Sequence, residues 1–233
     1  MIYSICKFNV EYEPRYLKLL RRSEKYIAED QSVTPDFKLF VSDEEIEAHK
    51  EKYNCTELLA EYVLIGIKFY QEIISRGAFF LHSAALAVDD FGYMFTGPCG
   101  AGKSTHASLW REYFKENVIS VNDDKPAIRF FDGVPYVCGT PFSGKHDINS
   151  NTIVKLKGIC ILKQHPENKI ERVSSAEAMP VLMEQTLRPE NPSDMMSLFD
   201  MLDKLLTKVP VYKLYCNISK EAVELSYNTM KNS

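Results

Sequence analysis

The sequence lacks any apolar run long enough to cross a bilayer, and its first residues, 1–6, lack the basic and long apolar parts of a signal peptide. It also lacks an excess of positive charge, since 28 Lys and Arg stand against 32 Asp and Glu, for a formal net charge of −4. General nucleic-acid binders usually carry a basic face. We therefore expect a cytoplasmic protein that binds neither a membrane nor nucleic acid.

Paired cysteines are missing as well. The six cysteines are scattered and form no CxxC pair, so in a cytosolic setting they predict reduced thiols rather than disulfides. They also share no zinc-site spacing with the histidines. Cys99 differs from the other five because it lies inside a glycine-rich segment, where we expect partial exposure.

The composition that remains is that of a globular protein. Of the 233 residues, 45% are hydrophobic and 26% are charged. We expect an α/β fold in two parts, a small N-terminal annex of strands and helices over residues 1–76 and a core with a mixed sheet and antiparallel hairpins over 77–233. In the annex, the patterns predict strands at 2–6 and 37–41, a capped helix from Ser42, and a buried helix over 56–74.

In the core, apolar runs and turn residues predict a series of strands and helices. Strands are expected at 79–88, 93–96, 118–121, 128–131, 134–138, 158–162 and 211–215. Helices are expected from Lys103 to about Lys115, from Ser174, after the separating segment Asn191-Pro192-Ser193 to about Lys208, and from Ser219. Residues 140–151 are polar and predict a mobile loop, which is either a closing lid or an ordinary surface loop.

The glycine-rich segment fits the pattern G-x-x-x-x-G-K-[ST] of a P-loop. Its glycines let consecutive N–H groups point at one phosphate, and the helix that follows adds its positive N-terminal dipole. Lys103 is expected to reach the β- and γ-phosphates, and the Ser104 hydroxyl to bind Mg²⁺. The residues expected to bind nucleotide are Gly97, Pro98, Cys99, Gly100, Ala101, Gly102, Lys103, Ser104 and Thr105. The sequence thus predicts ATP and Mg²⁺ as cofactors.

Two adjacent carboxylates, Asp123 and Asp124, end the strand after the P-loop helix. Near a phosphate site, such a pair can hold Mg²⁺ and accept a proton, although a pair in isolation is better explained by a solvated turn. In most P-loop NTPases the metal-binding Asp lies much further along the chain. Here only one helix and one strand separate Lys103 from Asp123.

This close spacing resembles the catalytic domain of HPr kinase/phosphorylase, a family of bacterial P-loop protein kinases related to carboxykinases. The resemblance covers residues 81–128. It comprises Leu81-His82-Ser83-Ala84 one hairpin before the P-loop, the P-loop itself, and the segment from Val121 to Ile128 that carries the Asp pair. The Glu-x-x-Gly segment of the family is absent downstream, so the chain looks like the divergent members that act on peptides or small hydroxyl compounds.

The resemblance implies a role for each matching residue. Asp124 would accept the proton of the substrate hydroxyl, His82 would support that aspartate, and Asp123 would assist or bind metal. Lys103 and Ser104 would hold the phosphates and Mg²⁺. It also implies a fold of the HPr-kinase/carboxykinase type and a homo-oligomer.

The leading hypothesis is therefore an ATP-dependent kinase that phosphorylates a hydroxyl, most directly that of a serine, on a protein, peptide or small molecule. Two alternatives stay open. One is a nucleotide-binding regulatory module without transfer activity, in which the loop 140–151 responds to the nucleotide. The other is a carboxykinase-like enzyme that acts on a small acid, which would need further metal ligands and an arginine for its substrate.

Overall fold

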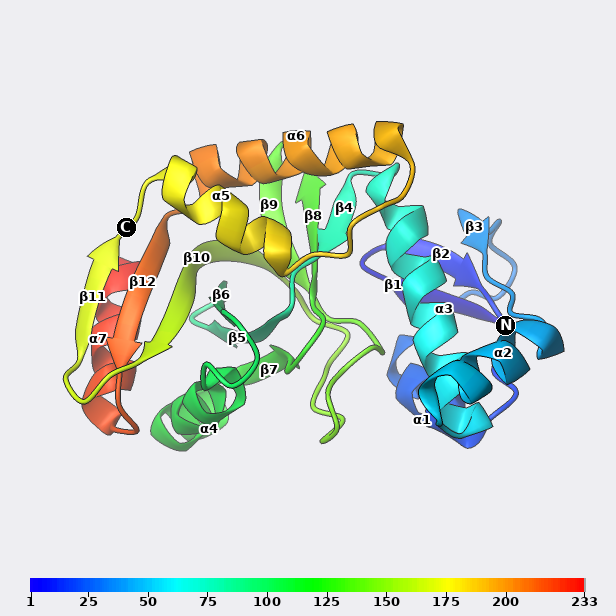
Figure 1. The fold of residues 1–233 in the computed structure, drawn as a ribbon, viewed down its shortest axis with the longest axis horizontal. Helices are drawn as coiled ribbons and strands as arrows, with labels where there is room; N and C mark the ends of the chain where they lie inside the picture. The colour runs from blue at the N-terminus through cyan, green and yellow to red at the C-terminus, as the bar shows by residue number, and fades with distance from the viewer. Residues whose placement is uncertain (233) are drawn as a thin grey trace.

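The computed structural model describes residues 1–232, and within that range the chain forms a mixed α/β fold, as predicted (Figure 1). The N-terminal part contains a small sheet and three α-helices on one side of the molecule. Its elements are β1 (Ile2–Ile5), β2 (Phe8–Glu11), α1 (Leu17–Ser23), a 3₁₀ turn (Glu24–Tyr26), β3 (Phe37–Lys38), α2 (Asp43–Tyr53) and α3 (Glu57–Ile74). Of these, β2 and α1 were not predicted.

The remainder of the chain builds one nine-stranded sheet flanked by helices. Its elements are β4 (Ala78–Phe80), β5 (Ser83–Val88), β6 (Phe91–Thr96), α4 (Lys103–Phe114), a 3₁₀ turn (Lys115–Asn117), β7 (Ile119–Asn122), β8 (Ala127–Phe131), β9 (Val134–Cys138), β10 (Ile153–Gln164), β11 (Lys169–Arg172), α5 (Ser175–Glu184), α6 (Pro192–Lys208), β12 (Val211–Cys216) and α7 (Lys220–Lys231).

The sheet is mixed because its long central strand, β10, has parallel and antiparallel neighbours. The order runs β4-β8-β9-β10-β6-β5-β7, with β12 also paired to β10 and β11 paired to β12. Strand β10 runs parallel to β6 and β12 and antiparallel to β9. The loops that follow β6, β10 and β12 therefore leave the sheet in the same direction, an arrangement that gathers them at one edge.

Helices cover both faces of this sheet, which curls between them (Figure 1). The alternation of side chains along β5 explains how one strand serves two cores. Ala85 and Ala87 face α5 and α6, whereas Ala84, Leu86 and Val88 face α4 and α7. The strand is apolar on both faces because both faces are buried.

The strand predicted at 79–88 is wrong as a continuous element, since the chain breaks between β4 and β5 at Leu81 and His82. β4 pairs with β8, but β5 pairs with β6 and β7, so the chain must change partners. At the break, the His82 amide donates to Gln185 O at 2.7 Å. The predicted strand 158–162 is also too short, because β10 extends over residues 153–164, and β11 was not predicted.

The N-terminal annex packs against the core through a shared hydrophobic cluster. Side chains from β1, β2 and α3 belong to this cluster together with Phe142, which lies in the loop between β9 and β10. The Phe142 ring contacts Tyr62, Phe69 and Tyr70, with centroid distances of 5.8, 5.5 and 5.6 Å. The loop that was predicted to be mobile is thus anchored at its start, where Thr140 to Ser143 are buried. The division of the chain at residue 76 stays a prediction.

Among residues 1–232, no helix is long and apolar enough to cross a membrane.

Candidate phosphate and carboxylate site

The P-loop segment connects β6 to α4, the strand–loop–helix context that the motif requires. Gly97, Gly100 and Gly102 have φ values of +141°, +81° and +100°, which residues with a side chain rarely adopt. A Cβ on Gly97 would also stand 3.2 Å from the Leu162 carbonyl oxygen of β10. The glycines are therefore needed for the path of the backbone.

The N-terminus of α4 has no side-chain cap, because its N-cap residue is Gly102. The amide groups of its first turn are consequently open to another acceptor, and the helix dipole adds positive potential there. Ser104 and Thr105 lie exposed in this first turn. The geometry suits an anion such as a phosphate group.

Lys103 lies over the loop rather than away from it. Its ammonium group donates to Gly97 O at 2.8 Å and to Pro98 O at 3.2 Å. Burial lowers the pKa of Lys103, while the negative charge of Asp124 acts in the opposite direction. The predicted phosphate-binding lysine is thus within the electrostatic range of the predicted catalytic aspartate.

The Asp pair is oriented by the residue that precedes it. Asn122 is buried, and its Oδ1 accepts from the backbone amides of Asp124 at 2.9 Å and Lys125 at 2.7 Å. Its Nδ2 donates to Thr140 O at 3.0 Å. These contacts form an Asx turn, which fixes the direction of both carboxylates. Sequence analysis assigned Asn122 no role, although Asn before two Asp residues is a recognisable turn signal.

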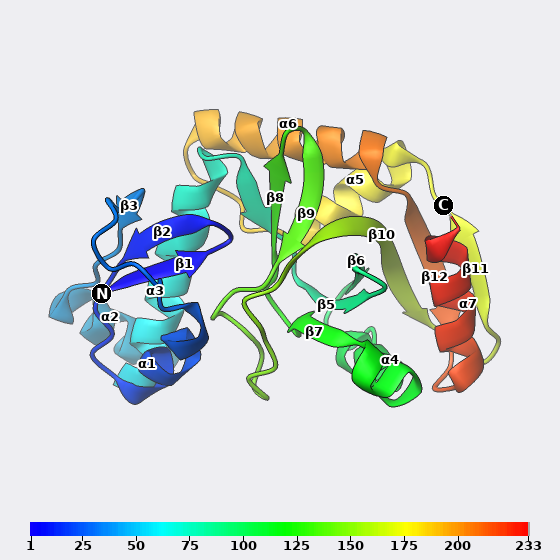
Figure 2. The same ribbon diagram turned by 180° about the vertical axis from the view of Figure 1, so that it is seen from behind.

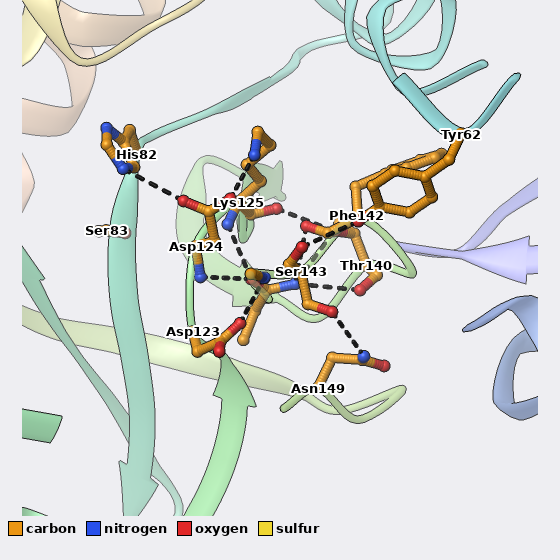
Figure 3. A network of polar contacts seen from close by, with 12 residues as sticks. Tyr62, His82, Ser83, Asp123, Asp124, Lys125, Thr140, Phe142, Ser143 and Asn149 are labelled. Atoms are coloured by element: carbon orange, nitrogen blue, oxygen red, sulfur yellow. Dashed lines mark hydrogen bonds and ion pairs between the residues drawn. The ribbon is translucent and has the colours of Figure 1, made fainter. Parts of the chain in front are cut away.

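Asp124 contacts the histidine that the sequence paired with it (Figure 3). His82 Nε2 lies 3.1 Å from Asp124 Oδ1, and the Lys125 ammonium group contacts Oδ2. Burial disfavours the ionised form of Asp124, but the hydrogen bond from His82 and the charge of Lys125 outweigh it and lower its pKa to about 2. Asp124 is therefore ionised at neutral pH. Lys125 is a further site residue that sequence analysis did not single out.

Asp123 points in a different direction and has a different environment. Its Oδ1 accepts from the Gly144 amide at 2.7 Å. Burial raises the pKa of Asp123, with a further contribution from the charge of Asp124, whereas the Gly144 hydrogen bond lowers it. Burial and the charge of Asp124 both disfavour the ionised form of Asp123, and a bound cation near this carboxylate would offset them.

One pocket joins the P-loop helix to Asp123. Its volume is about 220 Å³, and Ser104, Thr105, Arg111, Asp123 and His146 line it. Among residues 1–232, no three His, Cys, Asp or Glu side chains cluster to hold a metal. This donor set still fits Mg²⁺, which usually takes one or two protein oxygens and completes its shell with phosphates and water. Ser104 and Asp123 are the residues that would hold it.

The loop between β9 and β10 lies on the side of the core that faces the annex (Figure 2). An arginine of the annex holds residues 143–147 of this loop. Arg22, at the end of α1, donates from Nη1 to Ser143 O at 2.8 Å and from Nη2 to Gly144 O at 2.7 Å. Its Nε lies 3.3 Å from Asp147 Oδ1. Gly144 in turn donates to Asp123, so the annex reaches the carboxylate site through one residue. Sequence analysis missed Arg22 because nothing in the pattern marks a buried arginine in a helix that was itself not predicted.

The same loop carries a second contact from the annex. Tyr62 of α3 donates from its hydroxyl to Ser143 O at 2.9 Å and accepts from Arg22 Nη1 at 2.6 Å. Lys155 and Lys157 lie on β10 and Arg188 follows α5, and none of the three lines the pocket that contains Ser104 and Asp123.

Comparison with known proteins adds little to this geometry. No protein-family model matches the sequence, and no curated protein matches it. Among solved structures, the chain is similar to the Hpr(Ser) kinase/phosphatase from Coxiella burnetii, with a TM-score of 0.34 and 13% sequence identity. The similarity covers 66% of this chain and 95% of that one. At this TM-score the similarity defines no family and no activity.

Proposed function

We propose that this protein is a kinase that uses Mg²⁺ and ATP to phosphorylate a hydroxyl group, such as that of a serine, on a protein, peptide or small molecule. The observation that carries the proposal is the pocket in which Ser104 and Thr105 of the P-loop helix face Asp123, with the His82-bound Asp124 next to it in the chain. The candidate phosphate-binding residues and Asp123 therefore line one pocket, and Asp124 is the next residue along the chain.

The chemistry assigned to each group follows from its surroundings. The acceptor oxygen attacks the γ-phosphorus, its proton passes to Asp124, and the bond from the γ-phosphorus to the β–γ bridging oxygen breaks to release ADP. Lys103 and the first-turn amides of α4 stabilise the phosphate charge. Mg²⁺, held by Ser104 and Asp123, would neutralise further phosphate charge.

A pKa of about 2 makes Asp124 a weak base for this proton. Its partner Lys125 is half-exposed and belongs to a flexible residue type, so it can leave Asp124 and pair with an incoming phosphate instead. Loss of that positive charge raises the proton affinity of Asp124 at the moment when the acceptor is in place. His82 remains to orient the carboxylate.

The test is γ-phosphoryl transfer from labelled ATP with Mg²⁺ to free serine, serine-containing peptides and the carrier protein HPr. Asp124→Asn should lower the rate by about 100- to 10,000-fold, the usual contribution of general base catalysis, while ATP affinity is retained. Lys103→Ala should lose ATP binding. Exposed residues of the same types provide controls: Asp132→Asn in the β8–β9 turn and Lys204→Ala in α6 should behave as wild type.

The regulatory-module alternative makes the opposite prediction. A sensor needs the P-loop but no base, so ATP would bind, none of the acceptors would gain phosphate, and Asp124→Asn would leave any slow ATP hydrolysis unchanged. That combination would overturn the kinase proposal. The carboxykinase alternative has no specific observation in its favour within residues 1–232.

A further inference from the structure

A second, larger pocket adjoins the P-loop, with a volume of about 460 Å³. This lies within the range of about 300–1,000 Å³ that is typical of small-molecule sites. Its walls come from three loops: the P-loop with the start of α4, residues 164–166 after β10, and residues 216–218 after β12. The three strands β6, β10 and β12 are parallel neighbours, so their loops meet at the carboxyl edge of the sheet, where α/β proteins generally bind ligands.

The two pockets are linked by one residue. Thr105 lines both the smaller pocket that contains Asp123 and this larger one, whose lining includes neither aspartate. A ligand whose terminal phosphate lies near Ser104 and Asp123 can therefore continue across the start of α4 into the larger pocket. The Gln164 side chain supports this arrangement, because its Nε2 donates to Gly100 O at 2.7 Å and ties the β10 loop to the P-loop.

The lining suits a flat, partly polar group. Leu109, Pro166 and Ile218 offer apolar surface, and Ile218 is 77% exposed and so accessible to a ligand. Polar groups surround them. Among residues 1–232, two buried side-chain atoms have no hydrogen-bond partner: His106 Nδ1 and Asn217 Oδ1. Both residues line this pocket. Each unsatisfied buried group calls for an explanation, and a ligand in this pocket would provide one.

We propose that this pocket binds the nucleoside part, base and ribose, of the phosphate donor, so that the donor is a nucleoside triphosphate and not an inorganic polyphosphate. The inference rests on the proposed function, because it takes the P-loop as the phosphate site. It goes further by placing the base against Leu109 and Ile218, on the opposite side of Thr105 from the carboxylates.

The experiment compares the binding of ATP and of inorganic tripolyphosphate by calorimetry, both with Mg²⁺. Ile218→Ala removes exposed apolar surface from the pocket and should weaken ATP binding about 3- to 10-fold, with tripolyphosphate affinity unchanged. The matched control is Ile27→Ala, another exposed isoleucine, which lies in the annex and should change neither affinity. Leu109→Trp fills the pocket and should weaken ATP binding at least about 30-fold with the same lack of effect on tripolyphosphate.

The outcomes separate the two proposals. Selective loss of ATP affinity in Ile218→Ala supports the nucleoside pocket, and this variant decides the question even if Leu109→Trp fails to fold. If wild type binds both ligands equally and Ile218→Ala changes neither, the nucleoside pocket is overturned while the phosphate site stands. If wild type binds neither ligand, the proposed function fails and the nucleoside pocket fails with it.

Discussion

The two segments that meet at the candidate site are held in place in different ways. The P-loop, 97–104, takes its shape from its own glycines, and the contacts of Lys103 are with its own backbone carbonyls. The carboxylate segment, 122–124, has the local turn of Asn122 but also depends on distant residues: His82 before the P-loop, Thr140 and Gly144 in the β9–β10 loop, and Arg22 through that loop. One segment is locally encoded, and the other depends on the tertiary fold.

This difference has a functional consequence. The proposed phosphate site would bind its ligand whether or not the annex is correctly docked, whereas Asp123 keeps the fixed position of its Gly144 partner only when the annex is docked. Damage to the P-loop should therefore appear as lost nucleotide affinity, and damage to the annex contacts should appear as a lower rate at unchanged affinity. The predictions below test this separation.

The largest effect is expected from Gly97→Ala. A Cβ there combines a φ of +141° with contacts of 3.2 Å to Ala101 Cβ and to Leu162 O, so the P-loop must shift. We expect ATP affinity to fall about 100-fold, equivalent to about 2.7 kcal/mol of binding free energy. Isothermal titration with ATP and Mg²⁺ measures it.

Gly77→Ala is the matched control, because Gly77 also has a positive φ, of +78°, but no atom lies within 4 Å of its Cβ position. Both substitutions should lower the free energy of unfolding by about 1–2 kcal/mol through backbone strain. Only Gly97→Ala should also weaken the binding of ATP. Equal ATP affinity in the two variants would mean that the P-loop shape does not determine binding.

A smaller effect is expected from Arg22→Ala, which removes the anchors of Ser143, Gly144 and Asp147. With Gly144 free to move, Asp123 loses its fixed partner, and we expect kcat to fall about 10-fold, because misalignment by about 1 Å can cost up to 100-fold. The ATP dissociation constant should stay within about 2-fold of wild type. Steady-state kinetics and hydrogen exchange at residues 143–147 test this.

The neighbouring residue supplies the control. Arg21 has the same side chain but is exposed, so Arg21→Ala should change neither kcat nor the hydrogen exchange of residues 143–147. Arg22→Lys should recover only part of the rate, since an ammonium group cannot reach the carbonyls and the carboxylate in the fork geometry of a guanidinium. If Arg22→Ala weakened ATP binding as strongly as it lowered kcat, the two segments would not be separable.

The same difference, between local and long-range determinants, separates the features that the sequence could predict from those that it could not. The glycine-rich loop 97–104 with its flanking strand and helix, and the capping boxes at Ser42 and Ser174, depend on residues within a few positions of one another. The structure forms the strand, the helix and both capping boxes where they were expected, while the phosphate-binding role of the loop stays a prediction. The predicted pairing of His82 with the Asp segment came from a family resemblance, and the structure brings the two side chains together.

The remaining features depend on long-range packing. The break at Leu81 and His82 arises because β4 and β5 have different partner strands, information that the apolar run from 79 to 88 does not contain. Likewise, the polar composition of residues 140–151 predicted mobility, but Phe142 is buried among aromatic residues of α3. The roles of Arg22 and Tyr62 follow from docking of the annex and have no sequence signature.

The smallest effect is expected from Tyr62→Phe, which removes one hydroxyl from the contact between annex and loop. Burial raises the pKa of Tyr62 to about 12, so the hydroxyl is protonated at neutral pH and donates to Ser143 O. Arg22 still donates to the same oxygen in this variant. We expect a loss of about 1 kcal/mol in stability and a decrease of about 3-fold in kcat, measured by denaturant unfolding and by phosphoryl transfer.

A double-mutant cycle of Arg22→Ala and Tyr62→Phe then decides whether the annex acts as one unit on the loop. The two side chains contact each other at 2.6 Å and share Ser143 O, so their effects on kcat should not add. The double variant should be barely slower than Arg22→Ala alone, because loss of the arginine already frees the loop. Additive effects would indicate two independent contacts, and the carboxylate segment would then depend on the annex less directly than its hydrogen bonds imply.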